Sequence, residues 1–302
     1  MGEAHARHDL FGGLAAAASA VLFGAIIIWG RFVLDRGIPV ETMLSIRFAI
    51  GALVLTTAIL SRRRPVLAEP GERLRLAMLA LFGYAIEASV FFTATQHGTV
   101  ATVTLLFFTY PVFVTVWAWA FGGRLPARPT IIALACAVGG AAIVVGAGTG
   151  LAIDRVGVVL ALTTALTYSA YLTGVDLLIH RTNALTSAMW VSAGASLGLF
   201  AYANVVGHWQ VPSGAAEWGP LVGMGLASGA AFFFLMEALN RIGAVRTAII
   251  SAMEPLGAAV LGFWILGESV TLGVAAGGLL ILAGSVLASL ARTPTAQEQQ
   301  IP

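Results

Sequence analysis

The chain has 302 residues, of which 59% are hydrophobic and only 10% are charged, and its mean hydropathy is +0.92. A soluble domain has about 25% charged residues, so this composition excludes a protein whose whole surface faces water. All 16 basic residues are arginine, the net charge is only +2, and the single Cys136 excludes an intramolecular disulfide or a cysteine metal cluster. The sequence therefore predicts an integral membrane protein that binds no nucleic acid.

Ten apolar runs follow one another along the chain, each about 20 residues long and thus long enough to cross a bilayer as a helix. The small residues at 15–20 resemble a signal-peptide cleavage site, but the apolar run continues to Trp29, which favours a retained first helix. The polar residues 292–302 predict a disordered cytoplasmic tail. In chain order, we expect transmembrane helices over 11–30, 42–60, 74–95, 98–121, 130–148, 156–178, 185–206, 218–239, 243–266 and 270–290.

The arginines give the orientation. If the ten helices alternate in direction, Arg31, Arg36 and Arg155 fall on one side of the membrane and Arg47 falls inside a span. The other twelve of the 16 arginines fall on the opposite side. Arginine-rich loops are cytoplasmic, so both termini are expected in the cytoplasm of a bacterial cell, with the helices in its inner membrane.

The two halves of the chain repeat each other. A shift of 144 residues places Pro111 on Pro255 and Gly140 on Gly284. Each half contains five spans, an odd number, so the halves must cross the membrane in opposite directions. The prediction is an all-α integral membrane protein with ten transmembrane helices, arranged as two inverted five-helix repeats (1–150 and 151–291) around a central cavity. Such repeats place a substrate site near the bilayer midplane and permit alternating access.

Three stretches carry a family resemblance: PVETMLSIRFAIGAL at 39–53, EPLGAAVLGFWILGES at 254–269 and the glycine-rich GVAAGGLLILAGSVLA at 273–288. With the ten-span pattern, they resemble the EamA-type exporters of the drug/metabolite transporter superfamily, and most closely the bacterial exporters of aromatic and neutral amino acids. The resemblance implies export of a small-molecule substrate. The chain departs from it at Arg124, where the family pattern has a glutamate after the glycine.

Glu254 is a carboxylate inside an apolar run, followed directly by Pro255. An ionisable group at membrane depth is expensive, which makes it a candidate for a functional site. Thr247 and Ser251 precede Glu254 by seven and three residues, so the three side chains share one helix face. The alternative is that Glu254 only stiffens the helix beside the proline. We predict substrate binding for these three residues.

The repeat relation places the aromatic residues Phe107 and Tyr110 opposite this polar face. Phe107 corresponds to Ser251, and Tyr110 corresponds to Glu254. A cavity with one aromatic wall and one polar wall suits a small amphipathic substrate. The corresponding prolines, Pro111 and Pro255, are predicted to be kinks that open the cavity.

On the third span, Tyr84, Glu87 and Phe91 share a helix face by their spacing of three and seven residues. They are predicted to line the cavity, where Glu87 could also take a coupling proton, or else to form structural hydrogen bonds.

On the sixth span, Thr164, Tyr168 and Tyr171 form a stripe of hydroxyl groups. These groups could bind the ammonium or carboxylate of a substrate, or they could bond the carbonyls of their own helix. Arg47 is the one arginine well inside a span, and it could bind a substrate carboxylate or form a structural ion pair.

No nucleotide-binding loop, zinc-protease motif or nucleophile elbow occurs in the sequence, and no soluble domain is available to bind ATP. We therefore expect a secondary transporter rather than an enzyme, with no cofactor and no metal, and with a small molecule and membrane lipid as its partners. A drug or cationic-metabolite exporter is the alternative within transport. An intramembrane lipid-modifying enzyme and a non-transporting membrane scaffold are alternatives from other classes.

Overall fold

The structure is a computed structural model that describes residues 2–122, 128, 131–132, 135–136, 139–140, 142–143, 153–251, 254, 264–265, 267 and 271–290. Its elements within these residues are all helices, as the sequence predicts for a membrane protein. Most of the fifth predicted span, half of the ninth, Pro255 and the tail 292–302 lie outside the described residues.

In the first half, the third predicted span contains a six-residue π-helical segment, and the fourth is broken at Phe108 and Thr109. Pro111 is the second residue after this break, where a missing backbone N–H costs little because the first helical turn has no partner for it. The elements are α1 (Gly2–Leu34), α2 (Val40–Ser61), α3 (Arg73–Met78), η1 (Leu79–Tyr84), α4 (Ala85–Ala94), α5 (Val100–Phe107) and α6 (Tyr110–Gly122).

The second half contains α8 (Arg155–Leu178), α9 (Ala184–Val205), α10 (Ala215–Ile250) and α12 (Leu272–Leu290). α10 includes the expected eighth span and the start of the ninth, with a break between them at Gly243, whose φ is 73°. In the described part of the chain, seven helices are long and apolar enough to cross a membrane, and α12 contains the shorter apolar stretch Ala275–Gly284.

Three helices begin at a polar side chain that accepts a hydrogen bond from the backbone three residues later. Thr99 caps α5, Asp154 caps α8 and Asn183 caps α9. Each side-chain oxygen satisfies a backbone N–H that the first helical turn leaves without a partner. These polar residues therefore fix where three of the membrane helices begin.

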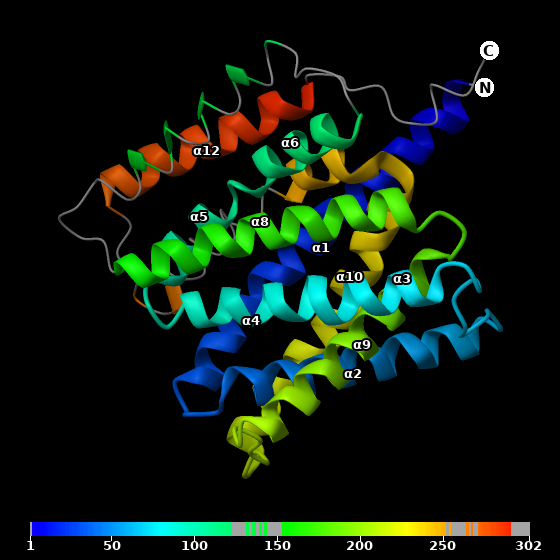
Figure 1. The fold of residues 1–302 in the computed structure, drawn as a ribbon, viewed down its shortest axis with the longest axis vertical. Coiled ribbons are helices and arrows are strands. Elements are labelled where there is room, and N and C mark those ends of the chain that lie inside the picture. Colours follow the sequence, from blue (N-terminus) through cyan, green and yellow to red (C-terminus); the bar gives the residue numbers. More distant parts are fainter. Residues whose placement is uncertain are drawn as a thin grey trace.

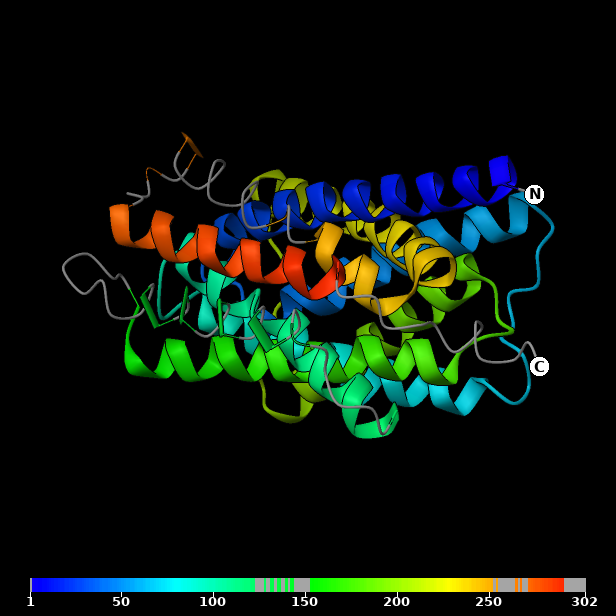
Figure 2. The same ribbon diagram turned by 90° about the horizontal axis from the view of Figure 1, so that it is seen from above.

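The helices pack mainly across the boundary between the two halves. α1 lies along α10, α2 lies along α9, and α4 lies along α8. Figures 1 and 2 show α1 and α10 on one side of the molecule and α4 and α8 on the opposite side. The buried aromatic and aliphatic side chains between these layers form one large core.

Small residues allow α2 and α10 to approach closely. A Cβ added to Gly229 would lie 3.1 Å from the Gly51 carbonyl oxygen, and one added to Gly225 would lie 2.5 Å from Ile50 Cβ. Backbone contact of this kind is how membrane helices associate, because lipid supplies no hydrophobic drive between them.

Candidate functional site

A cavity lies in the middle of the bundle, between helices of both halves. It contains about 420 Å³ of empty space, a figure that includes its opening. Three charged side chains and several aromatic rings face it. Its lining is Phe23, Ile26, Ile27, Arg47, Tyr84, Glu87, Ala88, Phe91, Phe92, Phe107, Tyr168 and Glu254.

Arg47 is only 2% exposed, on α2. Its Nε donates a hydrogen bond to Ser228 Oγ of α10 at 2.5 Å, and the side chain also donates to the Tyr84 hydroxyl. The guanidinium lies 4.7 Å from the ring centre of Phe48. These contacts hold a permanent positive charge at the cavity wall, because an arginine does not lose its proton in proteins.

Two carboxylates face the same cavity as Arg47. Glu87 of α4 is 5% exposed, and Glu254 is 9% exposed. Arg47 interacts electrostatically with both, and the two glutamates interact with each other. No direct ion pair joins Arg47 to either glutamate within the described residues. The three charges therefore surround the cavity instead of neutralising one another by contact.

The π-helical segment η1 ends at Tyr84, three residues before Glu87. A π-helical turn inserts extra backbone into a helix and is often found at functional sites, since it changes the direction of the side chains that follow. Here it lies immediately before the cavity-facing part of α4. The backbone irregularity and the charged site thus coincide in the third span.

Aromatic rings at the cavity contact one another. Phe107 lies 5.4 Å from Phe91 and 5.1 Å from Tyr168, measured between ring centres. Tyr168 lies 4.9 Å from Tyr110 in an edge-to-face arrangement. Such contacts hold the rings in place.

The structure brings six of the predicted binding residues to the cavity. These are Tyr84, Glu87, Phe91, Phe107, Tyr168 and Glu254. The cavity therefore combines the predicted face of the third span with residues from the fourth, sixth and ninth spans.

The other five predicted binding residues are buried but do not line the cavity. Thr164 donates its hydroxyl to the Leu160 carbonyl of its own helix, at 2.9 Å. Tyr110 and Ser251 are hydrogen-bonded to each other, which joins the aromatic and polar faces. The Tyr171 hydroxyl and the Thr247 hydroxyl are buried without a hydrogen-bond partner among the described residues.

Sequence reasoning did not assign Phe92 or the α1 residues Phe23, Ile26 and Ile27 to the cavity. Phe92 follows Phe91 directly, and adjacent residues of an ideal helix point about 100° apart. The α1 residues are ordinary aliphatic and aromatic side chains in an apolar span. The glycine at position 30 was a possible signal, because Phe92 packs against it: an added Cβ would lie 2.2 Å from Phe92 Cε1.

The sequence pattern of the EamA-like transporter family matches residues 10–146 and 155–290 of this chain. The chain belongs to the EamA-like transporter family. It is 24% identical over 286 residues to the "Uncharacterized inner membrane transporter YicL" of Salmonella typhimurium, covering 90% of this chain and 93% of that protein. It is 26% identical over 280 residues to an "Uncharacterized transporter" of Archaeoglobus fulgidus, covering 92% and 96% of the two chains.

A solved crystal structure has the same fold as this EamA-like protein. The TM-score is 0.65 at 20% sequence identity, and the alignment covers 94% of this chain and 99% of the other. The similarity therefore extends over the whole bundle, including the helices that line the cavity.

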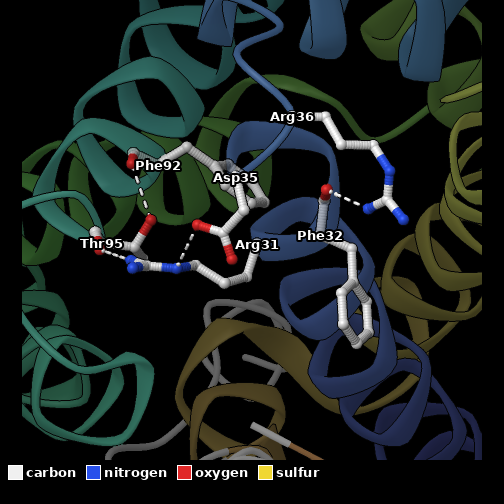
Figure 3. A network of polar contacts seen from close by, with 6 residues as sticks. All are labelled: Arg31, Phe32, Asp35, Arg36, Phe92 and Thr95. Atoms are coloured by element: carbon white, nitrogen blue, oxygen red, sulfur yellow. Dashed lines mark hydrogen bonds and ion pairs between the residues drawn. The ribbon is translucent and has the colours of Figure 1, made fainter.

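Beyond the cavity, polar contacts connect the ends of the helices in this EamA-like protein. Figure 3 shows Arg31 at the end of α1 donating to the backbone carbonyl of Thr95, which follows α4. Arg31 also pairs with Asp35 at 3.0 Å. Close by, His97 Nδ1 lies 2.9 Å from Asp154 Oδ2. The hydrogen bond from the Gly157 N–H and the contact with His97 lower the pKa of Asp154.

The carboxylate of Glu72 makes a second connection between the halves. It accepts backbone hydrogen bonds from His180, Arg181 and Thr182, each at 2.8 Å, and one from the Thr182 hydroxyl at 2.5 Å. Burial raises the pKa of this carboxyl, but the four hydrogen bonds outweigh burial and hold the pKa at about 2. Glu72 thus fixes the connection between α2 and α3 to the connection between α8 and α9.

Proposed function

We propose that this protein is a secondary transporter that exports small metabolites, aromatic or neutral amino acids, across the bacterial inner membrane by alternating access. One observation carries the proposal: the cavity is lined by the buried charges of Arg47, Glu87 and Glu254 together with aromatic rings. Burying charged side chains in a membrane protein costs free energy, and such side chains are typical of sites where a polar substrate crosses the membrane.

A zwitterionic amino acid matches this arrangement group by group. Arg47 offers a planar pair of N–H donors for the substrate carboxylate. Glu87 and Glu254 offer acceptors for its ammonium group. The rings of Phe107 and Tyr168 offer stacking area for an aromatic side chain. The hydroxyls of Tyr171 and Thr247 lack hydrogen-bond partners among the described residues. In this proposal these two hydroxyls, with Thr164, Ser251 and Tyr110, lie behind the cavity lining and reach the substrate through water.

The proposed architecture is ten helices in two inverted repeats that divide near residue 150. Two features support it. The family pattern matches two stretches of similar length, 10–146 and 155–290. The helix contacts also follow the repeat, in which each span of the first half corresponds to the span five later. The first span packs on the eighth, and the corresponding pair, the sixth and the third, pack on each other as well. The second and seventh spans correspond to each other and are in contact. Both termini are placed in the cytoplasm by the arginine distribution.

Alternating access in this arrangement is a rocking of the two repeats around the cavity. The break at 108–109 interrupts span four, and the break at Gly243 lies between spans eight and nine. We propose that Pro111 and Pro255 allow spans four and nine to bend when the cavity changes the side on which it opens. The inner-membrane location is taken from the name of the YicL relative.

The test is counterflow in proteoliposomes that contain only this protein. Vesicles loaded with unlabelled L-phenylalanine should take up labelled L-phenylalanine, and external phenylalanine should compete better than alanine because only its ring gains stacking area. Lipid flipping or hydrolysis without amino-acid exchange would favour the lipid-modifying enzyme, and the absence of any exchange would reject the transport proposal.

A cationic-metabolite exporter is the second candidate, and the charges that line the cavity are the observation that supports it. The cavity has two carboxylates and one guanidinium, so a substrate with one positive charge can balance the second carboxylate. Phenethylamine, which has the ring and ammonium of phenylalanine without the carboxylate, separates the two candidates. It should compete better than phenylalanine if the protein exports cations, and worse if Arg47 binds a substrate carboxylate.

A further inference from the structure

We propose that Glu87 and Glu254 share one exchangeable proton when the cavity is empty, and that a substrate with one positive charge displaces it. The inference rests on the proposed function only in taking the cavity as the substrate site. The shared proton follows from the charges that surround the cavity. Its consequence is that the number of protons released on binding depends on the charge of the substrate.

The first step is the net charge of the site. Arg47 contributes +1, and the two glutamates would contribute −2 if both were ionised. All three side chains are at most 9% exposed, and one unbalanced buried charge is costly in a medium of low dielectric constant. A single proton on either carboxylate makes the cluster neutral. The neutral state of the empty cavity therefore has one proton for two carboxylates.

The second step is that, among the described residues that line the cavity, no other group supplies the missing charge. Tyr84 comes from η1, Tyr168 and Tyr171 come from α8, and Tyr110 comes from α6; all four hydroxyls are uncharged at neutral pH because an ordinary tyrosine has a pKa of about 10. The α1 residues in the lining are apolar, and Phe107 is the α5 residue that faces the cavity.

The other charged residues of α10 lie outside the cavity lining, and Arg246 among them is exposed. Asp176 of α8 lies outside the lining as well. Glu237 pairs with Arg241 at 2.5 Å, and neither residue is part of the cavity lining. Among the described residues, the proton is thus the group left to neutralise the second cavity glutamate.

The third step concerns the substrate. A zwitterion brings no net charge, so the cluster stays neutral only if it keeps its proton. A monocation brings +1, so the cluster becomes neutral by releasing the proton to water as the cation binds. Phenethylamine should therefore displace one proton, whereas phenylalanine should displace none. If transport takes place through this site, the amine exchanges for a proton and the amino acid does not.

The test is infrared difference spectroscopy of the purified protein, in which a protonated carboxylic acid has its own C=O band. The wild type at pH 7 should show the band of one protonated acid. Glu87→Gln and Glu254→Gln should each abolish it, because either change leaves Arg47 balanced by the one remaining carboxylate. Glu237→Gln is the control and should keep the band.

This pattern separates a shared proton from a carboxyl that is protonated by burial alone. If one glutamate held the proton by itself, the substitution of the other would leave the band unchanged, and that result would overturn the proposal. The absence of the band in the wild type at pH 7 would also overturn it. Neither outcome depends on transport, so it leaves the proposed function to be judged by counterflow.

The exchange is tested on the same samples with two probes. Saturating phenethylamine should remove the wild-type band, and a pH indicator in weakly buffered detergent solution should register about one proton released per protein. L-phenylalanine should leave the band in place. A band that survives phenethylamine, or that phenylalanine removes to the same extent, would reject the exchange.

Discussion

Arg47 Nε and Ser228 Oγ are joined by a hydrogen bond of 2.5 Å, which connects α2 in the first half to α10 in the second. Ser228 is fully buried and does not line the cavity. It therefore orients the guanidinium from behind. In Ser228→Ala, we expect a loss of about 1.5–3 kcal/mol in stability, typical of a hydrogen bond to a charged group, and weaker phenylalanine binding.

The control for this substitution is Ser192→Ala. Ser192 is also fully buried, but its hydroxyl has no hydrogen-bond partner among the described residues. Removing an unpaired buried hydroxyl should leave stability unchanged or raise it. The thermal unfolding of both variants in detergent measures the difference. Equal melting temperatures would mean that the Arg47–Ser228 bond contributes nothing.

The Glu72 carboxylate predicts a particular dependence of stability on pH. Its pKa in the folded protein is about 2, whereas an unperturbed glutamate has a pKa of about 4.3. The stability that it contributes is complete above about pH 4.3 and is lost as the pH falls toward 2. Glu72→Gln should lower the melting temperature at pH 7. Between about pH 4.3 and 2, the melting temperature of this variant should fall less steeply than that of the wild type.

The matched control is Glu69→Gln, because Glu69 is exposed and lies three residues away in the same connection. Its melting curve should follow that of the wild type. An identical decline with pH in the wild type and in Glu72→Gln would show that the four hydrogen bonds to Glu72 do not control acid stability.

Gly30 provides a means of narrowing the cavity from behind. A Cβ at this position would lie 2.2 Å from Phe92 Cε1, and the Phe92 ring lines the cavity. We expect Gly30→Ala to displace the ring, to cost about 1–3 kcal/mol through overpacking, and to slow the exchange of phenylalanine more than that of alanine. Gly219→Ala is the control, since nothing lies within 4 Å of its added Cβ. Equal counterflow in the two variants would show that the position of the Phe92 ring does not control which substrate size is accepted.

Phe107 should contribute to the selection of aromatic substrates. Its ring contacts Phe91 and Tyr168 at the cavity. Phe107→Ala should weaken phenylalanine binding by about 0.5–1.5 kcal/mol, roughly 2- to 10-fold, and should leave alanine binding nearly unchanged. Phe121→Ala is the control, because that ring is 70% exposed. Competition counterflow measures both variants, and equal losses for the two amino acids would make Phe107 a packing residue.

Reporter fusions test the inverted architecture directly. A reporter placed after Arg62 or Arg292 should be active only in the cytoplasm, and one placed after Thr149 should be active only in the periplasm. Thr149 lies between the two halves, after five expected spans. A cytoplasmic reporter there would mean that the first half crosses the membrane an even number of times, and the two halves would then not be inverted.

The sequence by itself determined the class of the protein and the position of most helices. Length, apolar content and the cost of unpaired backbone in lipid are properties of each segment alone, so α2, α8 and α9 lie within a few residues of their predicted ranges. The spacing of Tyr84, Glu87 and Phe91 likewise predicted a shared face, and all three line the cavity.

The tertiary structure decided which side chains meet. Arg47 could not be assigned to the cavity from its own helix, because its surroundings come from Tyr84, Ser228 and Glu254 on other elements. Thr164 has the right residue type and repeat position, but it bonds its own helix. Helical periodicity determines which side chains share one face of a helix. The angle and depth at which helices pack determine which residues of other helices that face contacts. The cavity and its charge balance therefore arose only when the two halves were brought together.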